Sequence, residues 1–331
     1  MRKFIFRRLL SLIPIVLGAT FLTFLIISLT PGDFVTSMSL NPEISPSTIA
    51  KLRHDFGLDQ PWYIQYGLWL YRLSPVQLPF GLKIPDLGYS FANKTPVVNL
   101  IGERFLNTLI LSLSAEFLIW TIGIPLGVLA AIKRRTWIDR LSSFGVYLGI
   151  SIPEILLALA ALLFAATTGW FPIGGMHTLG YEDWPAGAQL RDLLHHLALP
   201  ATVLAITGTA GLMRYMRGSL LETLGSDYVR TARAKGVSEN QAVLRHAFPN
   251  AINPIITLFG ISFANLISNS FLVEIIMGWP GLGRLAYEAI LAKDLYVIMA
   301  SLLMATLFLV IGNLLADVLL GITDPRIRYE H

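Results

Sequence analysis

Long uninterrupted hydrophobic blocks dominate the pattern of the chain. A helix needs roughly 20 apolar residues to cross the hydrocarbon core of a bilayer. Pro200, Gly208 and Gly211 interrupt one block, but transmembrane helices tolerate such residues where neighbouring helices satisfy the backbone. The pattern therefore predicts an all-α polytopic membrane protein with six transmembrane helices. The blocks lie at about 9–30, 105–132, 141–167, 197–213, 251–278 and 296–322.

The first block has some features of a secretory signal peptide. Arg2, Lys3, Arg7 and Arg8 precede it, as in a basic amino-terminal region. Its apolar run is longer than a signal core, and no small-residue cleavage site follows. We therefore expect an uncleaved first transmembrane helix.

The composition agrees with a membrane protein. Of 331 residues, 54% are hydrophobic and 14% are charged, whereas soluble proteins carry about 25% charged residues. The chain has no cysteine, which excludes disulfides, thiolate metal sites and cysteine nucleophiles.

The distribution of Lys and Arg predicts the orientation. With the amino terminus in the cytoplasm, segments 1–8, 133–140, 214–250 and 323–331 are internal and hold 16 Lys and Arg in 62 residues. The external segments hold 9 in 119 residues. Cytoplasmic loops carry the excess of basic residues in membrane proteins. Both termini are therefore predicted to be cytoplasmic.

The external segment 31–104 is too long to be a turn. Ser45-Pro46 is typical of a helix start, and predicts a short helix through Arg53. A second amphipathic helix, rich in Trp and Tyr, is expected from Pro61 to Leu73. These helices can form an interfacial aromatic belt, a docking platform for an external partner, or both.

The internal segment 214–250 carries a pattern of two short helices. Gly225 is expected to end a long helix, Ser226-Asp227 to cap a short helix from Tyr228 to Lys235, and Gly236 to stop it in a left-handed conformation. Ser238 with Gln241 fits a capping box for another helix that runs to about Phe248.

Two other interpretations of this basic loop are weaker. A helix-turn-helix suggests DNA binding, but short helices tethered on both sides to membrane spans do not suit it, and we expect no nucleic-acid partner. The other interpretation is a solvated loop whose basic residues only keep this segment on the cytoplasmic side. Arg230, Arg233 and Lys235 are consistent with either a topogenic or a partner-binding role.

Residues 227–236, DYVRTARAKG, resemble the ATPase-coupling loop of ABC importer permeases, in the form found in dipeptide and oligopeptide permeases. The general pattern is E-A-A, three residues, Gly, nine residues, then I-x-L-P. Here E-A-A falls on 230–232 and Gly on Gly236, while the last places fall on His246, Phe248 and Pro249. Glu, the first Ala, Ile and Leu are replaced, and the spacing is kept.

The resemblance extends over nearly the whole chain in a fixed order. The segments that carry it are 7–10 (RRLL), 30–33 (TPGD), 57–61 (GLDQP), 86–90 (DLGYS), 279–284 (WPGLGR) and 324–328 (DPRIR).

This resemblance implies the type I ABC importer permease fold, in the first of two paired permeases of a bacterial inner membrane. The implied partners are a second permease, two cytoplasmic ABC ATPases and an extracytoplasmic substrate-binding protein. ATP and Mg²⁺ would be bound by the ATPases, since the chain has no P-loop sequence. The expected coupling residues are Asp227, Tyr228, Arg230, Thr231, Ala232, Ala234, Lys235, Gly236 and Pro249.

Four acids lie within the predicted spans: Glu116, Glu154, Glu274 and Asp317. Each costs roughly 2.5–3.5 kcal/mol at a helix centre in lipid, so each should face protein or water. Glu116, Glu154 and Glu274 are candidates for the translocation pathway, where an acid favours a peptide ammonium group. The alternatives are structural pairing, which we favour for Glu274 and Asp317, and a buried contact to the partner permease.

Candidate enzyme sites are poor. His195 and His196 are adjacent and point to different helix faces, so they cannot chelate one metal ion unaided. Glycines 278, 281 and 283 lie in a loop with no preceding strand, which is unsuitable for a dinucleotide. We predict no catalytic residue, metal site or cofactor in this chain.

The sequence thus divides into 1–30 (amino terminus and first span), 31–104 (external segment), 105–322 (permease core with coupling loop 218–250) and 323–331 (tail). The expected function is ATP-driven import of di- and oligopeptides by alternating access. The alternatives are the same fold with nickel complexes, glutathione or oligosaccharides as cargo, a proton-coupled transporter using Glu116 and Glu154, and a non-transporting scaffold.

Overall fold

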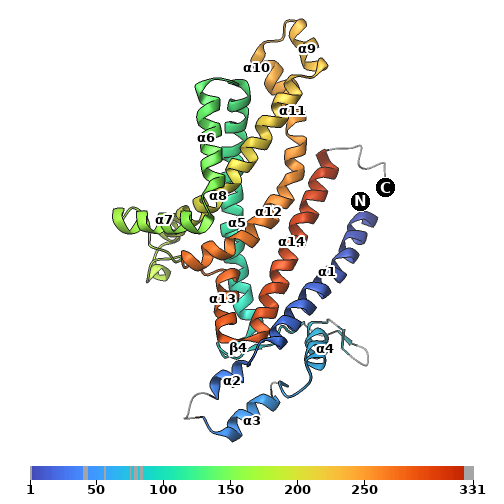
Figure 1. Ribbon diagram of the computed structural model, residues 1–331, viewed down its shortest axis with the longest axis vertical. Coiled ribbons are helices and arrows are strands. Elements are labelled where there is room, and N and C mark those ends of the chain that lie inside the picture. Colours follow the sequence, from blue (N-terminus) through green and yellow to red (C-terminus); the bar gives the residue numbers. More distant parts are fainter. Residues whose placement is uncertain are drawn as a thin grey trace. The chain divides into compact units, whose positions relative to one another are not determined.

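The computed structural model describes the backbone of residues 2–39, 44–55, 57–74, 76–77, 81–82 and 85–323. Side chains at 2–12, 37, 55, 76–77 and 81–82, at several positions of 257–267 and at 315–323 lie outside this description, as does the predicted tail signature 324–328. Asp317 is among these side chains. The chain folds as two compact units (Figure 1).

The core unit comprises Met1–Ile5, Thr108–Trp279 and Phe308–His331. It is helical, as predicted. Its helices are α5 (Val97–Ile132), which begins in the other unit, α6 (Trp137–Ser151), α7 (Glu154–Thr168), the short η1 (Tyr181–Asp183), α8 (Ala186–Leu224), α9 (Asp227–Ala234), α10 (Glu239–Gln241), the π-helical turn η2 (Ala242–Ala247), α11 (Phe248–Ala251) and α12 (Asn253–Ile276).

Two glycines of α5 allow it to approach α8 closely. A Cβ atom on Gly127 would lie 2.7 Å from Cβ of Met216, and one on Gly123 would lie 3.2 Å from Leu212. The two glycines are four residues apart and so share a helix face. This small-residue face is a common contact between membrane helices, and the sequence analysis did not identify it.

Apolar helix lengths agree with a multi-pass membrane protein. Within the described residues, four segments are long and apolar enough to span a bilayer, and a bent pair makes up to five. The predicted span 251–278 corresponds to α12, several of whose side chains are not described. The count of six and the orientation of the termini stay predictions. The four segments are Ile13–Thr36, Val97–Ile132, Ala186–Leu224 and Leu295–Leu314.

The predicted span 141–167 falls on two helices, and the chain bends by 100° between α6 and α7. Ile152 is extended, with φ −89° and ψ 121°, as is usual for a residue before proline. Pro153 has no N–H and cannot continue the helix. Figure 1 shows α7 running across the direction of α6 and α8.

The predicted span 197–213 is too short. Helix α8 is continuous from Ala186 to Leu224 and contains Pro200 without a break. Pro200 is buried against the core, and packing there compensates for the hydrogen bond that proline cannot make. The helix ends at Leu224, before Gly225, as predicted.

An ion pair joins α6 to α8. Arg217 donates through Nε and Nη2 to the two carboxylate oxygens of Asp139, at 2.7 and 3.0 Å. The backbone N–H of Arg135 also donates to Asp139, at 2.9 Å. The Asp139 side chain is only 9% exposed, so this bidentate pair fixes the spacing of the two helices.

The second unit comprises Phe6–Asn107 and Pro280–Leu307. Two antiparallel pairs of two-residue strands, β1 with β2 and β3 with β4, are the additions to the all-α prediction. The elements are α1 (Arg2–Leu29), α2 (Phe34–Met38), α3 (Pro46–Asp55), α4 (Trp62–Leu73), β1 (Val76–Gln77), β2 (Gly81–Leu82), β3 (Tyr89–Ser90), β4 (Thr95–Pro96), α13 (Leu282–Ala292) and α14 (Leu295–Thr323), which ends in the core unit.

The predicted short helices of the external segment are confirmed. Ser45 Oγ accepts a hydrogen bond from the N–H of Thr48 at 3.2 Å, which caps α3. Helix α4 follows Pro61 and packs on α1: Tyr66 lies 5.4 Å from Phe24 between ring centroids, and 3.1 Å from the Thr20 hydroxyl. Through these contacts, the aromatic helix α4 packs against the first predicted span.

Buried polar contacts explain the segment 86–90. Asp86 accepts the N–H of Gly88 at 2.8 Å, and Gly88 has φ +94° with Tyr296 only 2.8 Å from its missing Cβ. Ser90 donates to the buried Asp294 at 2.7 Å. These residues hold the β3–β4 pair against the α13–α14 turn, which is a structural role.

Candidate coupling loop and membrane acids

Helix α9 has one buried face and one exposed face. Val229 is fully buried and Ala232 is 9% exposed, whereas Tyr228 is 47% exposed. The separation follows the helical period, since 229 and 232 are three residues apart. The remaining predicted coupling residues are all exposed: Asp227, Arg230, Thr231, Ala234, Lys235, Gly236 and Pro249.

Gly236 ends α9 as the sequence predicted. Its φ is +86°. Its N–H donates to the carbonyl of Arg233 at 2.9 Å, and the N–H of Val237 donates to Ala232 at 3.2 Å. This pair of bonds is the Schellman motif, in which a left-handed residue closes the helix. No atom lies within 4 Å of a Cβ added to Gly236, so the backbone conformation, and not space, requires glycine.

The predicted side-chain caps are wrong. Ser226 and Ser238 occupy N-cap positions, but neither side chain caps the following helix. Ser226 Oγ instead donates to the carbonyl of Thr223 at 2.6 Å, on the preceding turn. The glycine turn therefore defines the two short helices more strongly than the serines do.

The return helix is longer than predicted and contains a π turn. It runs from α10 through η2 and α11 to Ala251, beyond the expected end at Phe248. The π turn ends just before Pro249 in α11, which has no N–H to donate to the preceding turn. Such turns are often found at functional sites.

The inner face of the loop is part of the protein core. Val229, Val243 and Ala247 are at most 1% exposed and belong to one cluster with Met216 of α8. Ser219 of α8 also donates to the carbonyl of Ala251 at 2.8 Å. The loop is therefore a rigid extension of α8 and α12.

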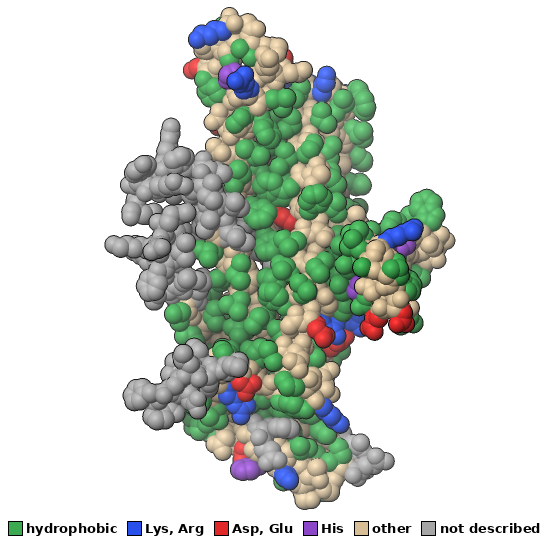
Figure 2. Space-filling model, turned by 180° about the vertical axis from the view of Figure 1, so that it is seen from behind, with side chains coloured by type: hydrophobic (Ala, Val, Ile, Leu, Met, Phe, Trp, Pro, Cys, Tyr) green, Lys and Arg blue, Asp and Glu red, His purple; other side chains and the backbone are tan. Residues whose placement is uncertain are grey.

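The outer face of the loop carries charges. Arg233 pairs with Glu239 at 2.6 Å and links α9 to α10. Arg230 makes a looser pair with Asp227 at 3.6 Å, and both side chains are exposed, at 69% and 97%. Figure 2 shows charged side chains gathered at the tip of the molecule that carries α9, above mainly hydrophobic helices.

Glu116 and Glu274 are buried and satisfied by hydrogen bonds. Glu116 accepts from Trp120 at 2.7 Å and from Ser262 at 3.1 Å. Glu274 accepts from Thr108 at 2.7 Å and from Ser270 at 3.1 Å. They are 3% and 0% exposed. Both acids therefore hold α5 to α12.

Glu154 differs from these two acids. It begins α7 after the bend and makes no hydrogen bond or ion pair with any described residue. Its side chain lines a hollow of about 320 Å³ between α5, α8 and α12. The sequence analysis missed the other polar residues of this hollow, which carry no motif: Thr207, Tyr215, Ser262 and Asn269.

The structure brings two of the three candidate acids into one region. Ser262 lines the hollow beside Glu154 and also donates to Glu116. Glu274 is 12 residues further along α12 than Ser262, which corresponds to about 18 Å of helix. Glu154 therefore lines the hollow, Glu116 contacts the lining residue Ser262, and Glu274 is not part of the lining.

These features define a class of protein. Long apolar helices, two buried acids satisfied by hydrogen bonds and an exposed helical loop are those of a polytopic membrane protein. Residues 123–329 match the family described as binding-protein-dependent transport system inner membrane component, and residues 1–113 match the amino-terminal family of the same systems. The chain belongs to this family, and is thus a multi-pass protein of the inner membrane.

Its relatives include peptide permeases over their full length. The chain is 42% identical to the oligopeptide transport system permease protein AppB of Bacillus subtilis, covering 99% of this chain and all of AppB. It is 40% identical to a putative peptide transport system permease protein of Brucella abortus and 36% identical to the glutathione transport system permease protein GsiC of Escherichia coli K12, covering both chains fully in each case.

A solved structure shares the fold. A chain of the inward-facing MetNI methionine ABC transporter aligns with a TM-score of 0.57 and 18% identity, over 69% of this chain and 97% of that chain. The predicted ABC importer permease fold is therefore confirmed.

Proposed function

We propose that this chain is the first of two paired permeases in an ATP-driven importer of di- and oligopeptides. It works by alternating access with a second permease, two cytoplasmic ATPases and an extracytoplasmic binding protein. The observation that carries the proposal is the loop of α9–α11, whose inner face is buried in the core and whose outer face is exposed and charged. The family match supports the same assignment.

The loop is joined to two long helices, so it can transmit movement to both. Its buried face is continuous with α8, and its return helix leads into α12 after a short break. A rigid-body movement of an ATPase docked on the exposed face would therefore move both helices together. The exposed coupling residues, from Asp227 to Gly236, are available for this contact.

The relatives favour peptides as cargo. Those at 40–42% identity are named for oligopeptide or peptide transport, while GsiC, at 36%, is named for glutathione transport. Glutathione, itself a small peptide, is therefore the second candidate.

The hollow beside Glu154 is our candidate for part of the pathway. An unpaired carboxylate among apolar helices is costly, and a cationic group of the cargo would offset that cost. Glu116 is already hydrogen-bonded, so we assign it the role of holding Ser262 and the wall of the hollow.

The proposal requires the α9 loop to lie in the cytoplasm. Because the chain has no native cysteine, single cysteines report the topology directly. We expect cysteines at Ser47 and at Leu179, which is 98% exposed, to react with an impermeant thiol reagent in sealed cells. Cysteines at Arg134 and Ser238 should react only after lysis. Labelling of Ser238→Cys in sealed cells would reverse the orientation and remove the ATPase contact.

Isolation of the intact assembly tests the partnership. Affinity purification of the full chain from its native membrane should retain one copy of the second permease and two ATPase chains for each copy of this chain. Recovery of the chain alone or as a homodimer, in a detergent that preserves a related importer, would favour a secondary transporter or a scaffold.

A further inference from the structure

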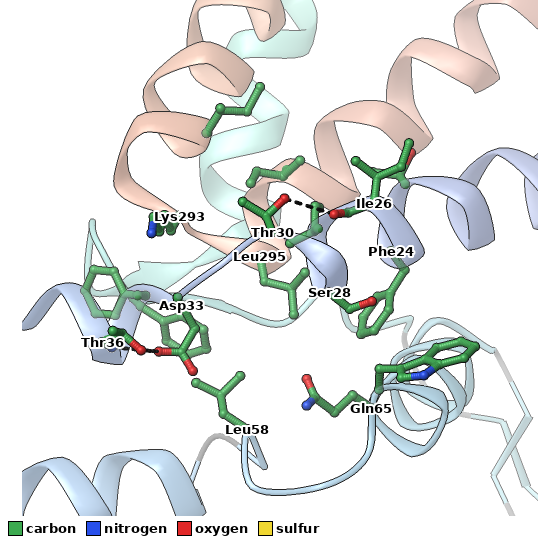
Figure 3. Close-up of a pocket in the computed structure, with 18 of the residues that line it drawn as sticks. Phe24, Ile26, Ser28, Thr30, Asp33, Thr36, Leu58, Gln65, Lys293 and Leu295 are labelled. Carbon is green, nitrogen blue, oxygen red and sulfur yellow. Dashed lines mark hydrogen bonds between the residues drawn. The ribbon is translucent and has the colours of Figure 1, made fainter.

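A second cavity lies entirely within the second unit, whereas the loop and the membrane acids belong to the core unit. It measures about 750 Å³ and is lined by residues of the end of α1, α2, α3, the connection before α4, α4 itself and the α13–α14 turn. Figure 3 shows Leu58, Gln65 and Thr30 around it. Its size is that of a small-molecule site, and the proposed transport function does not use it.

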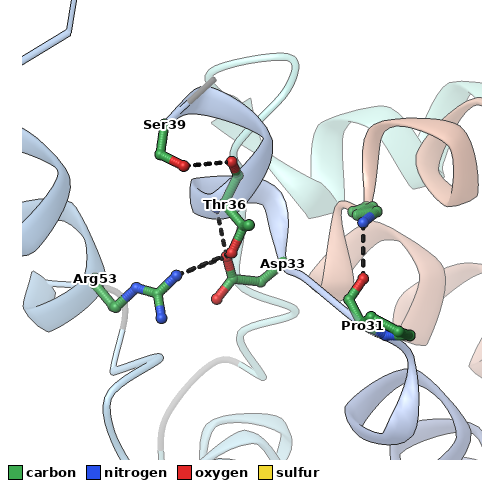
Figure 4. A network of polar contacts seen from close by, with 6 residues as sticks. Pro31, Asp33, Thr36, Ser39 and Arg53 are labelled. Atoms are coloured by element: carbon green, nitrogen blue, oxygen red, sulfur yellow. Dashed lines mark hydrogen bonds and ion pairs between the residues drawn. The ribbon is translucent and has the colours of Figure 1, made fainter. Parts of the chain in front are cut away.

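The described lining residues of this cavity carry a net positive charge. The charged ones among them are Arg53, Lys293 and Asp33. Asp33 is already neutralised, since it accepts from Thr36 at 2.6 Å and from Arg53 at 3.3 Å (Figure 4). One cation is therefore in excess.

Both cations have donors left for a ligand. Lys293 Nζ donates to the carbonyl of Pro31 at 2.9 Å and pairs with no described carboxylate. Arg53 uses only Nη2, toward Asp33 and Thr36. Lys293 also sits at the end of α13 with φ +55°, a conformation that favours Gly or Asn.

Apart from five polar residues, the rest of the lining is apolar and lies at the end of a candidate membrane span; the polar residues are Thr23, Ser28, Thr30, Thr36 and Gln65. Phe24 and Ile27 of α1 and Leu295 and Ile298 of α14 are among the apolar residues that line it. The cavity contains the last part of the candidate span Ile13–Thr36, and α4 beside it carries the aromatic residues typical of a membrane interface.

We propose that this cavity binds a membrane phospholipid with an anionic headgroup. The phosphate lies between Lys293 and Arg53, and an acyl chain runs along Phe24, Ile27 and Ile298. Charge-assisted hydrogen bonds to phosphate suit both cations, and an acyl chain suits the apolar wall. A free phosphate would leave this wall uncovered, and a soluble anionic segment of a partner protein would not require a site at the end of a span.

Photocrosslinking in native membranes tests the occupant. A benzophenone amino acid replaces Leu58, which points into the cavity (Figure 3), in the full chain. We expect adducts with the mass of a phospholipid. A control probe at Leu179, exposed and outside the cavity, should give at least fivefold less of this adduct. Crosslinks from Leu58 to protein only, or equal lipid adducts from both sites, would overturn the proposal.

A matched pair of substitutions tests the charge. Lys293→Asn keeps a residue that tolerates positive φ and removes the cation. Lys94→Asn makes the same change at φ +52°, in the same unit but outside the cavity. Native mass spectrometry of the purified full-length chain with added phosphatidylglycerol measures lipid binding. We expect Lys293→Asn to bind the lipid about fivefold more weakly than the unchanged chain, and Lys94→Asn to bind it equally well.

Inorganic phosphate and dihexanoyl phosphatidylglycerol serve as competitors and separate the possible sources of the anion. We expect the short-chain lipid to compete and phosphate to have no effect at the same concentration. Equal losses in the two variants, or competition by phosphate as strong as by lipid, would exclude the phospholipid site.

Discussion

Gly236→Val lowers ATP-driven peptide uptake by roughly tenfold while the chain still inserts and still pairs with the second permease. Gly236 holds φ +86° at the end of α9, a conformation that costs other L-residues about 1–2 kcal/mol. A β-branched residue there opens the Schellman turn and tilts the exposed face of α9. Uptake and ATP hydrolysis in proteoliposomes measure the effect, together with the number of ATPase chains retained.

Two controls separate coupling from general strain. Gly236→Asn keeps a residue that tolerates positive φ and should retain most of the uptake. Gly180→Val places the same strain in another connection, at φ +79° and equally without neighbours, and should leave uptake unchanged. Normal uptake, hydrolysis and ATPase retention in Gly236→Val would remove the coupling assignment, as would equal losses in Gly236→Val and Gly180→Val.

Glu154→Gln lowers uptake of peptides with a free amino terminus about tenfold more than uptake of the same peptides with an acetylated amino terminus. The carboxylate lines the hollow with no partner among the described residues, so a cargo ammonium is the group that it can pair with. A buried charged pair of this kind contributes a few kcal/mol at most. Initial uptake rates of the two labelled peptides give the ratio.

Glu116→Gln is the matched control for this prediction. It makes the same chemical change on an acid that Trp120 and Ser262 already satisfy. We expect it to affect expression or both uptake rates, without a change in the ratio of free to blocked peptides. If Glu154→Gln also leaves the ratio unchanged, the residue has a structural role and the hollow is not an ammonium site.

Local sequence signals predicted much of the fold. Pro and Gly positions correctly predicted the start of α3 after Ser45, the start of α4 after Pro61 and the end of α9 at Gly236. Proline narrows the range of backbone conformations at its own position, and glycine widens it. The hydrophobic blocks located the long helices by composition alone. The ends of these helices were predicted less accurately. Helix α8 runs from Ala186 to Leu224, because residues on both sides of the apolar block 197–213 continue the helix.

Tertiary contacts explain what the sequence did not predict. Pro153 ends a helix locally, but the 100° angle between α6 and α7 could not be predicted from it. The Asp139–Arg217 pair joins residues 78 positions apart, and no local pattern reveals it. The hollow beside Glu154 takes its lining from α5, α7, α8 and α12, so its polar residues could be found only once these helices were assembled.

The central claim is that this chain imports peptides with energy from ATP hydrolysed by other chains. The direct measurement is uptake of labelled di- to hexapeptides by proteoliposomes that contain this chain, the second permease, both ATPases and the binding protein. The account predicts accumulation that requires ATP, persists when the proton gradient is dissipated, and exceeds the accumulation of glutathione. Uptake that a proton gradient drives without ATP, or ATP-dependent uptake of glutathione with none of the other peptides, would contradict it.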